Sequence, residues 1–329
     1  MRSFEINNTS TSPILAVTWK QSAIESQRLN FIVCIIASFI HALFWLQLVF
    51  YPVVRQKALQ WIYAYLIVDI LLLLRFFLLY IVHTKYRSFT SNVLWTLVVC
   101  YIEAAVDNYL NILGVYILLA LNISRYMQIA HNRNVYDKHP QWLILFHLSI
   151  CLAPFLFLFI QFLVGWSKLK QSNDDLCDSY SVNVYIQILN IFVAFAFPIA
   201  SNIFVIALSV RHVRLTSTLR RTVHHVSARE KYNRSLVIQF LVFYIVWLSL
   251  WSPNVISYQL ITGTDEITLI TRLLNSIEIA LDPIIVGALD VRFWQIWKKL
   301  CSNFKCFNLR KRVRRSIKVV PAHKRENIY

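Results

Sequence analysis

Seven long apolar stretches are the feature that most constrains how this 329-residue chain can fold. They lie at about 30–51, 61–82, 93–121, 141–166, 183–210, 235–261 and 267–289. Each reaches the roughly 20 residues that a helix needs to cross a bilayer. Because backbone polar groups cannot stay unpaired in hydrocarbon, such segments are expected to form a helix bundle. The sequence therefore predicts an all-α membrane protein with a seven-transmembrane helix domain over residues 30–289.

Composition supports a membrane bundle and argues against other classes. Hydrophobic residues make up 57% of the chain, against roughly 45–50% in an ordinary soluble domain. The chain has no His-Glu-x-x-His motif, nucleophile elbow, Gly-rich phosphate loop or paired metal-ligand motif, so we expect no enzyme activity. The net charge of +17 is distributed between apolar spans. It should therefore face lipid head groups or a cytosolic partner, and nucleic acid is not an expected partner.

The distribution of basic residues predicts the orientation. Segments 52–60, 125–140, 211–234 and 290–329 carry 24 Lys and Arg, whereas the alternate connections carry 7. Such an excess marks the cytoplasmic side. We therefore expect an extracellular N-terminus over residues 1–29 and a basic cytoplasmic tail over 290–329, in a multi-pass protein of the plasma membrane. Six spans would place the tail on the wrong side.

Several residues outside the spans are candidates for modification. Asn7 and Asn8 begin two overlapping glycosylation triplets in the predicted extracellular segment. Cys301 and Cys306 follow the stretch "DVRFWQIWKKL", which is expected to form a short amphipathic eighth helix. Palmitate on these cysteines would anchor that helix, and free cytosolic thiols are an equal alternative. Cys100 near the outer face and Cys177 in an outer loop lie in an oxidising compartment, where two thiols can bridge.

Motifs at characteristic spacings occur in successive spans. The second span contains "LIVDILLLL" with Asp69, and the third ends in "SRY" at residues 124–126, with Arg125 lying 25 residues after Cys100. The fifth has Pro198, the sixth "WSP" with Trp251 and Pro253, and the seventh "DPIIV" with Asp282 and Pro283, followed by Phe293. Together, and in this order, these motifs resemble the rhodopsin-like (class A) family of G-protein-coupled receptors over nearly the whole chain.

The resemblance implies a switch between two states. In this family an agonist between the outer halves of the helices favours an open cytoplasmic cavity that receives a heterotrimeric G protein. Arg125 and Tyr126 match the residues that meet the G protein, and Trp251 with Pro253 matches the pivot beneath the ligand. The resemblance also implies a Cys100–Cys177 disulfide. The alternatives are a membrane-edge anchor for Arg125 and core packing for Trp251.

The seventh span carries two acids and a proline inside a membrane. Glu278 and Asp282 are four residues apart and share one helix face, which should turn inward toward Asp69. Pro283 can act as a hinge, because neighbours satisfy the freed carbonyl. The resemblance implies a sodium site built on Asp69, here with Glu278 and Asp282 in place of asparagines and Gly114 in place of a hydroxyl. Protonated acids that act as buried hydrogen-bond donors are an equal alternative.

Other positions depart from the family pattern. Ser124 replaces the acid that normally pairs with Arg125, and Asn233 stands where a second acid is common. Fewer restraints on Arg125 predict that the resting state, without ligand, suppresses signalling less completely. Ile206 and Val286 replace the tyrosines that support the active state, so the sign of basal activity stays open. A decoy that binds ligand without signalling is one alternative that follows.

Two acids mark the expected ligand pocket. Asp107 stands where amine receptors hold their ligand carboxylate, and Glu103 is one turn away on the same face. Buried acids without an internal cation favour a cationic ligand. Trp251, Asn254 and Ser276 are expected to line the same pocket. Asn254, Val255 and Ser276 replace aromatic residues, however, so the cage that holds a small ammonium is missing.

Three interpretations of these acids remain. Arg75 in the second span can pair internally with Asp107 or Glu103; a basic, neuropeptide-like ligand can bind them; or a small amine can. A retinal Schiff base is not expected, because the seventh span has no Lys. A divergent chemosensory protein and an ion-coupled transporter are further alternatives. The chain lacks the internal repeat and Gly-rich broken helices of transporters, so a peptide-type receptor is the favoured prediction.

Overall fold

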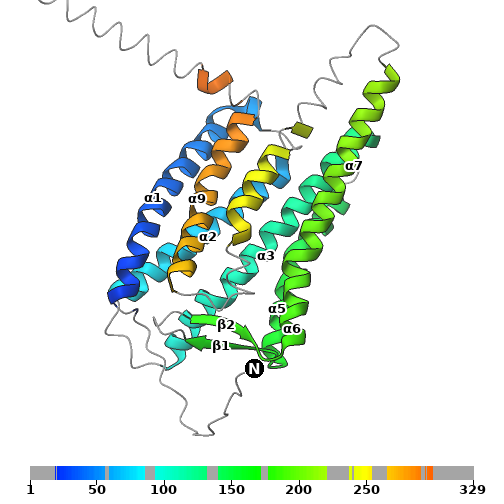
Figure 1. The fold of residues 1–329 in the computed structure, drawn as a ribbon. Helices are drawn as coiled ribbons and strands as arrows, with labels where there is room; N and C mark the ends of the chain where they lie inside the picture. The colour runs from blue at the N-terminus through cyan, green and yellow to red at the C-terminus, as the bar shows by residue number, and fades with distance from the viewer. Residues whose placement is uncertain are drawn as a thin grey trace, which may run out of the picture.

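Long helices that lie side by side form nearly all of the described structure (Figure 1). The computed structural model describes residues 19, 21–55, 59–85, 93–131, 140–171, 177–220, 237–238, 241–253, 265–289, 293 and 295–298. The helices are α1 (Gln21–Phe50), η1 (Pro52–Val54), α2 (Gln60–Lys85), α3 (Val93–His131), α5 (Pro140–Leu163), α6 (Val184–Ile191), η4 (Phe192–Ala196), α7 (Phe197–Arg220) and α9 (Asp265–Leu289). A shorter apolar helix covers Leu241–Pro253.

Five helical segments in the described part of the chain are long and apolar enough to cross a membrane. They correspond to the first five predicted spans and cover Ile24–Phe50, Gln60–Lys85, Leu97–Ala130, Leu143–Leu163 and Val184–Leu215. The sixth predicted span coincides with Leu241–Pro253, whose flanks lie outside the described residues. The seventh coincides with α9, which carries Arg272, Glu278 and Asp282 and is therefore too polar to be recognised by composition. α1 and α3 extend well beyond the apolar stretches that predicted them.

The fifth span is continuous through three helical segments. Between α6 and α7 the chain forms a wider π-helical turn, η4, which ends with the Phe197 N–H donating to the Phe192 carbonyl. Pro198 follows at once and has no N–H to donate to the Ala194 carbonyl. A local widening of the helix is a common response to such a lost bond. Pro154 and Pro283 likewise lie inside α5 and α9.

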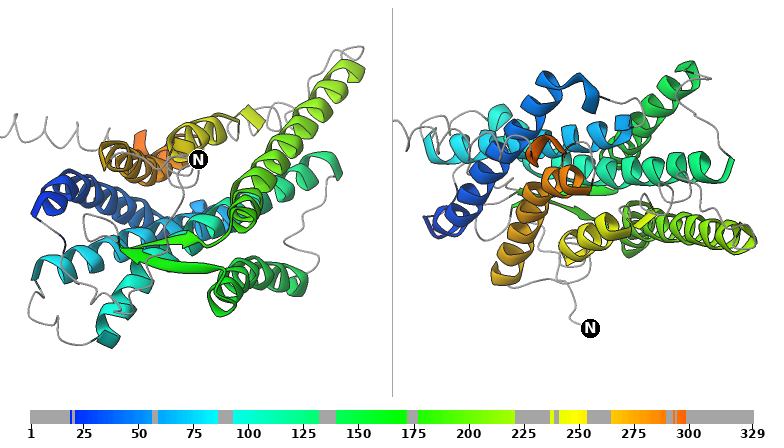
Figure 2. Two further views of the ribbon diagram at one scale, coloured as in Figure 1. Left: turned by 60° about the horizontal axis from the view of Figure 1, so that its bottom comes forward. Right: turned by 90° about the horizontal axis from the view of Figure 1, so that it is seen from above.

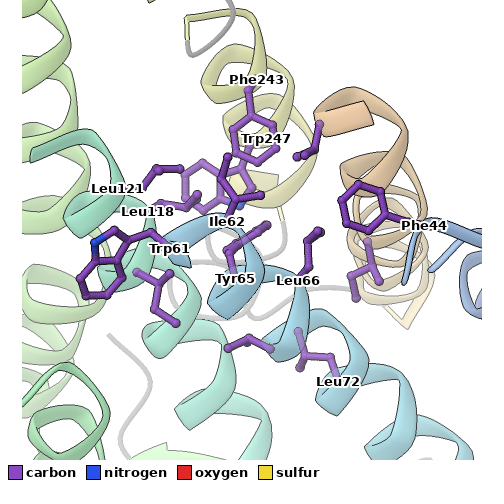
Figure 3. Close-up of a cluster of buried hydrophobic side chains, with 14 of the residues drawn as sticks. Phe44, Trp61, Ile62, Tyr65, Leu66, Leu72, Leu118, Leu121, Phe243 and Trp247 are labelled. Carbon is purple, nitrogen blue, oxygen red and sulfur yellow. The ribbon is translucent and has the colours of Figure 1, made fainter. Parts of the chain in front are cut away.

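The core lies where α2, α3 and the helix Leu241–Pro253 meet, and Phe44 of α1 packs at its edge (Figure 3). α3 is the central element, since it contacts α2, α5, α7 and both strands. α1 packs mainly against α9. The buried side chains labelled in Figure 3 are Phe44, Trp61, Ile62, Tyr65, Leu66, Leu72, Leu118, Leu121, Phe243 and Trp247. The outward faces of α1, α5 and α7 are largely exposed and apolar.

A two-stranded antiparallel hairpin crosses one end of the bundle (Figures 1 and 2). Strand β1 (Ser167–Gln171) pairs with β2 (Cys177–Ser181), and Leu169 lies opposite Ser179. Before β1, Gly165 adopts a φ of 75° and Trp166 donates its N–H to the Gln161 carbonyl, which ends α5. The sequence did not predict these strands. We call this side of the bundle the hairpin end.

The chain after α9 packs closely at the opposite end. Phe293 stacks on Phe44 of α1 at a centroid distance of 4.9 Å, and the Trp297 indole N–H donates to Gln47 at 2.7 Å. A Cβ on Gly287 would lie 2.6 Å from the Trp297 ring, so this close approach requires glycine. Phe293 and Gln295–Lys298 are helical. Asn7, Asn8, Asn233, Asn254, Cys301 and Cys306 lie outside the described residues, and their predicted roles stay predictions.

Replacing Trp61 by Ala should destabilise the bundle strongly. Trp61 is 1% exposed and its ring stacks on His147 of α5 with centroids 3.7 Å apart. Loss of a buried Trp typically costs about 3–5 kcal/mol. The apparent melting temperature of the purified protein measures the effect. The matched change Trp95→Ala removes a 40% exposed ring, and an equal loss in both variants would contradict the packing described here.

Candidate functional site

A polar cleft opens at the hairpin end between α1, α2, α3 and α9. Its volume is about 90 Å³, and Cys177 of β2 also lines it. Amide side chains contribute from two helices, Gln27 and Asn30 from α1 and Asn275 from α9. The charged lining residues are Arg75, Glu103, Asp107 and Arg272. The cleft thus offers hydrogen-bonding groups and charges of both signs.

A disulfide holds the hairpin against the cleft. Cys100 near the start of α3 is bonded to Cys177 at the start of β2. The resemblance of the sequence motifs to the family implied this disulfide. A second link is the hydrogen bond from the Asn108 amide to the Ser179 hydroxyl at 2.7 Å. Because both links start on α3, the hairpin and α3 form one unit on this side of the cleft.

Glu103 is engaged by groups of the protein itself. The Trp19 indole N–H donates to one carboxylate oxygen at 3.3 Å, and the Cys177 backbone N–H donates to the other at 3.1 Å. His83 Nε2 lies 3.5 Å from the same group, and the Trp19 ring stacks on the His83 ring with centroids 4.4 Å apart. Glu103 therefore contacts Trp19, the end of α2 and the hairpin.

Asp107 is paired with Arg75, so the internal ion pair that was one of the three interpretations is present, and the two ligand interpretations stay predictions. An Arg75 guanidinium nitrogen lies 2.7 Å from an Asp107 carboxylate oxygen. The same guanidinium donates to the backbone carbonyls of Ile102 and Glu103. The side chains are 16% and 32% exposed, which leaves one side of Asp107 open to the cleft. A cationic ligand would therefore have to compete with Arg75 for this carboxylate.

Trp251 lies deeper, in a stack of aromatic rings. Its ring is 4.7 Å from that of Trp247 and 5.9 Å from that of Phe195, measured between centroids. The Trp251 indole N–H donates to the Asn111 amide oxygen at 3.2 Å. Both the predicted pivot and the core packing that was its alternative fit this position. Pro253 lies two residues later in the same helix.

Ser276 lines the cleft on α9, as predicted. Its hydroxyl donates to the Arg272 carbonyl at 3.2 Å and accepts a hydrogen bond from the Cys34 thiol of α1 at 3.8 Å. Since one partner lies in its own helix and the other on α1, Ser276 helps join α1 to α9. A direct role in ligand binding stays a prediction.

The three predicted acids meet in the core. Asp69, Glu278 and Asp282 are only 2%, 3% and 1% exposed. The Tyr65 hydroxyl donates to Glu278 at 2.5 Å, and Asp282 interacts electrostatically with both other acids. One carboxylate oxygen of Asp69 and one of Asp282 are buried without a hydrogen-bond partner among the described residues. The inward orientation of this helix face is thus as the sequence predicted.

Carboxylate oxygens are suitable ligands for a hard cation, but their arrangement here does not form a clear cation site. Among the residues described, no three His, Cys, Asp or Glu side chains are placed so as to hold a metal ion. The position of the expected hydroxyl is Gly114, which packs against the Tyr65 ring. Three neighbouring carboxyls without a cation cannot all be ionised. Either one or more of these carboxyls are protonated or a cation balances their charge, and both interpretations stay predictions.

Arg125 lies at the opposite end of α3 and is 5% exposed. Its guanidinium donates to the Gln128 amide oxygen at 3.0 Å, and Ser124 donates its hydroxyl to the Leu121 carbonyl. One turn earlier, the Asn122 amide donates to Asn202 of α7 at 2.6 Å. Tyr126 is half-buried beside Arg125. This level of the bundle therefore joins α3 to α7 through neutral amides.

The sequence was compared with known proteins. It matches the family model described as 7 transmembrane receptor (rhodopsin family) over residues 46–285. The chain belongs to the rhodopsin family of seven-transmembrane receptors. No curated protein matches it significantly. The receptor is accordingly a multi-pass membrane protein with a signalling role and is not an enzyme.

Two residues that the sequence did not single out contact Glu103 of the cleft. Trp19 is 3% exposed and His83 is 1% exposed, and both contact Glu103. The sequence contained a usable signal for Trp19, because a Trp within a polar N-terminal segment is expected to pack its ring against an apolar neighbour. His83 carried no comparable signal, since its position at the end of an apolar span fits an interface residue equally well.

A double-mutant cycle should detect the Arg75–Asp107 pair. We expect Arg75→Gln and Asp107→Asn to be non-additive by about 1 kcal/mol in receptor stability, a size typical of partly exposed ion pairs. Thermal unfolding of the purified single and double variants gives this coupling. Asp107→Asn combined with Arg28→Gln on α1, which is exposed, should be additive. Additivity in both cycles would show that the Arg75 contact contributes nothing.

Substitution of Asp282 should distinguish protonated acids from a sodium site. Asn reproduces the shape and hydrogen bonding of a protonated Asp, so Asp282→Asn should melt within a few degrees of the wild type. Asp282→Ala should cost roughly 1–3 kcal/mol, because it leaves buried polar partners unsatisfied. Melting curves in sodium chloride and in choline chloride at equal ionic strength should coincide. A sodium-dependent stabilisation that Asp282→Asn abolishes would instead support the cation site.

Proposed function

We propose that this receptor binds an extracellular peptide-like ligand in the hairpin-end cleft and transmits binding to a heterotrimeric G protein at the Arg125 end. In this proposal the hairpin end faces the outside of the plasma membrane and the basic tail faces the cytoplasm. The disulfide at the hairpin end and the 24 Lys and Arg in the alternate segments support this orientation.

The observation that carries the ligand proposal is the chemistry of the cleft. The Asn30 amide donates to Gln27 at 3.3 Å, whereas the amide oxygens of Asn30 and Asn275 have no partner among the described residues and can accept from a peptide backbone. The charges of both signs suit charged side chains. A small amine would need an unoccupied carboxylate. Both candidate carboxylates already have partners, Asp107 in Arg75 and Glu103 in Trp19 and the Cys177 N–H. A peptide with several contacts can compensate for breaking one of these pairs more easily than a small cation.

The aromatic stack gives a physical route for the signal. Trp251 lies between Asn111 of α3 and the ring of Trp247, and Tyr244 continues the stack one turn further along the same helix. The Tyr244 hydroxyl approaches the Ile199 carbonyl of α7 at 3.5 Å. A ligand that moves Trp251 would therefore shift the helix Leu241–Pro253 against α7. Such a shift requires the ligand to bind one arrangement more tightly than the other.

A decoy that binds ligand without signalling is the second candidate. Arg125 has a neutral partner in Gln128, and Ser124 is engaged with the Leu121 backbone. Ser124 stands where the family pattern has the acid that restrains Arg125. In addition, the tyrosine positions that support the active state are Ile206 and Val286. The test therefore needs separate measurements of ligand binding and of G-protein activation.

Screening the full-length receptor in cells against amidated peptides, basic peptides and amines tests the proposal. We expect a peptide hit that activates a labelled G protein, and an N-terminal tag that antibodies reach on intact cells. Arg125→Ala should abolish activation and keep surface binding of the labelled peptide.

Asp107→Asn separates the ligand classes. A peptide response should fall by no more than about tenfold, since one contact among several is worth about 1.4 kcal/mol. A response to amines alone that Asp107→Asn eliminates would overturn the peptide proposal. Binding without activation of any G protein would identify a decoy.

A further inference from the structure

A second hollow lies far from the cleft, between α7 and the helix Leu241–Pro253 at the Arg125 end. Its volume is about 670 Å³, within the roughly 300–1,000 Å³ range of ligand pockets. The lining residues are Ile203, Ile206, Ala207, Val210, Arg211, Arg214, Leu215, Leu241, Tyr244, Ile245 and Leu248. We call this hollow the α7 groove. All of its walls are apolar or aromatic except for two arginines.

Each wall of the α7 groove is one face of a helix. On one side Tyr244, Ile245 and Leu248 lie three, four and seven residues after Leu241, the spacings that share a helix face. α7 contributes residues from Ile203 onward at the same kind of spacing. α7 is part of the membrane span Val184–Leu215. The groove is therefore open to lipid, as the half-exposed side chains on both walls also indicate.

The two arginines lie at one end of the α7 groove. Arg211 and Arg214 are three residues apart, and both side chains are exposed. From Ile203 to Arg211 the helix rises about 12 Å at 1.5 Å per residue. Half of the hydrocarbon core of a bilayer is about 15 Å thick. The groove therefore has the dimensions of one leaflet, with an apolar channel at acyl-chain depth and positive charge at head-group depth.

We propose that the α7 groove binds an anionic phospholipid, whose phosphate contacts Arg211 and Arg214 and whose acyl chain lies between α7 and the helix Leu241–Pro253. Guanidinium groups bind phosphate oxygens through paired hydrogen bonds. Anionic lipids are concentrated in the cytoplasmic leaflet, which this end faces in the proposed orientation. An apolar groove without the arginines would suit any lipid tail, and the arginines alone would suit any phosphate. An apolar groove about as long as one leaflet is thick, with arginines at its head-group end, selects a lipid with a negative charge.

Native mass spectrometry of the full-length receptor in detergent tests this site. Phosphatidylserine, phosphatidylcholine and glycerophosphoserine, which is the same charged head group without acyl chains, are titrated in turn. We expect the receptor to bind at least one molecule of phosphatidylserine with higher affinity than it binds phosphatidylcholine. Arg211→Gln with Arg214→Gln should weaken it roughly 30-fold, since each cation near a charged lipid contributes about one kilocalorie per mole. Arg211→Lys with Arg214→Lys keeps both charges and loses only the paired hydrogen bonds, so it should weaken binding less than the Gln variant does.

A second pair of variants tests the apolar part of the groove. Ala207 is an exposed lining residue, so Ala207→Trp should fill the groove and reduce phosphatidylserine binding. Ala153→Trp adds the same ring to an exposed position on α5 and should have no effect. Melting temperatures verify that all variants are folded.

Three outcomes would overturn the proposal. Equal affinity for phosphatidylserine and phosphatidylcholine would exclude selection by charge. Undiminished binding to the Gln variant or to Ala207→Trp would place the lipid elsewhere, on the basic loops or the tail. Full competition by glycerophosphoserine would show a phosphate site that does not use the groove. None of these outcomes affects the extracellular ligand proposal, because the cleft and the groove share no residue.

Discussion

A polar group inside hydrocarbon must find its partner within the protein, and the arrangement of this receptor follows from that requirement. Arg75 meets Asp107 and two backbone carbonyls, Glu103 meets an indole and a backbone N–H, and Glu278 meets the Tyr65 hydroxyl. Each of these partners comes from a different part of the chain. Pairing of buried polar groups therefore determines which helices are neighbours. Apolar packing alone selects poorly between possible helix pairs, because lipid tails are as apolar as the helix surfaces.

The same requirement gives the two ends of the bundle different properties. At the hairpin end, α3 carries the disulfide and the two acids of the cleft, so the hairpin, the segment before α1 and α2 all converge on one helix. At the opposite end a neutral hydrogen bond, from the Asn122 amide to Asn202, joins α3 to α7. Neutral hydrogen bonds generally cost less to break than charged ones. Movement between α3, α7 and the helix Leu241–Pro253 is therefore easier at this end, as a transmitted signal requires.

Particular residues show which parts of the structure could be predicted from the sequence. The inward orientation of Glu278 and Asp282 toward Asp69 was predictable, because four-residue spacing and the energetic penalty of a charge in lipid leave one answer. The family resemblance implied the Cys100–Cys177 bond, and the structure contains it. Whether Arg75 would neutralise Asp107 stayed open, since either acid of α3 was within reach of its side chain. The hairpin and the Trp19–His83 stack were not predicted, because both depend on segments that become neighbours only after α2, α3 and α5 have packed.

The sequence by itself determined that this protein lies in a membrane as a bundle of helices, which of its faces turn inward, and the family to which it belongs. These follow from the length of apolar runs, the placement of charges and motif spacing, all of which are local or periodic. Only the tertiary structure decided which groups the cleft acids contact, and that an apolar groove with two arginines lies between α7 and the helix Leu241–Pro253. The reason is geometric: a partner's identity depends on the rotation and approach of separate helices, which no single segment encodes.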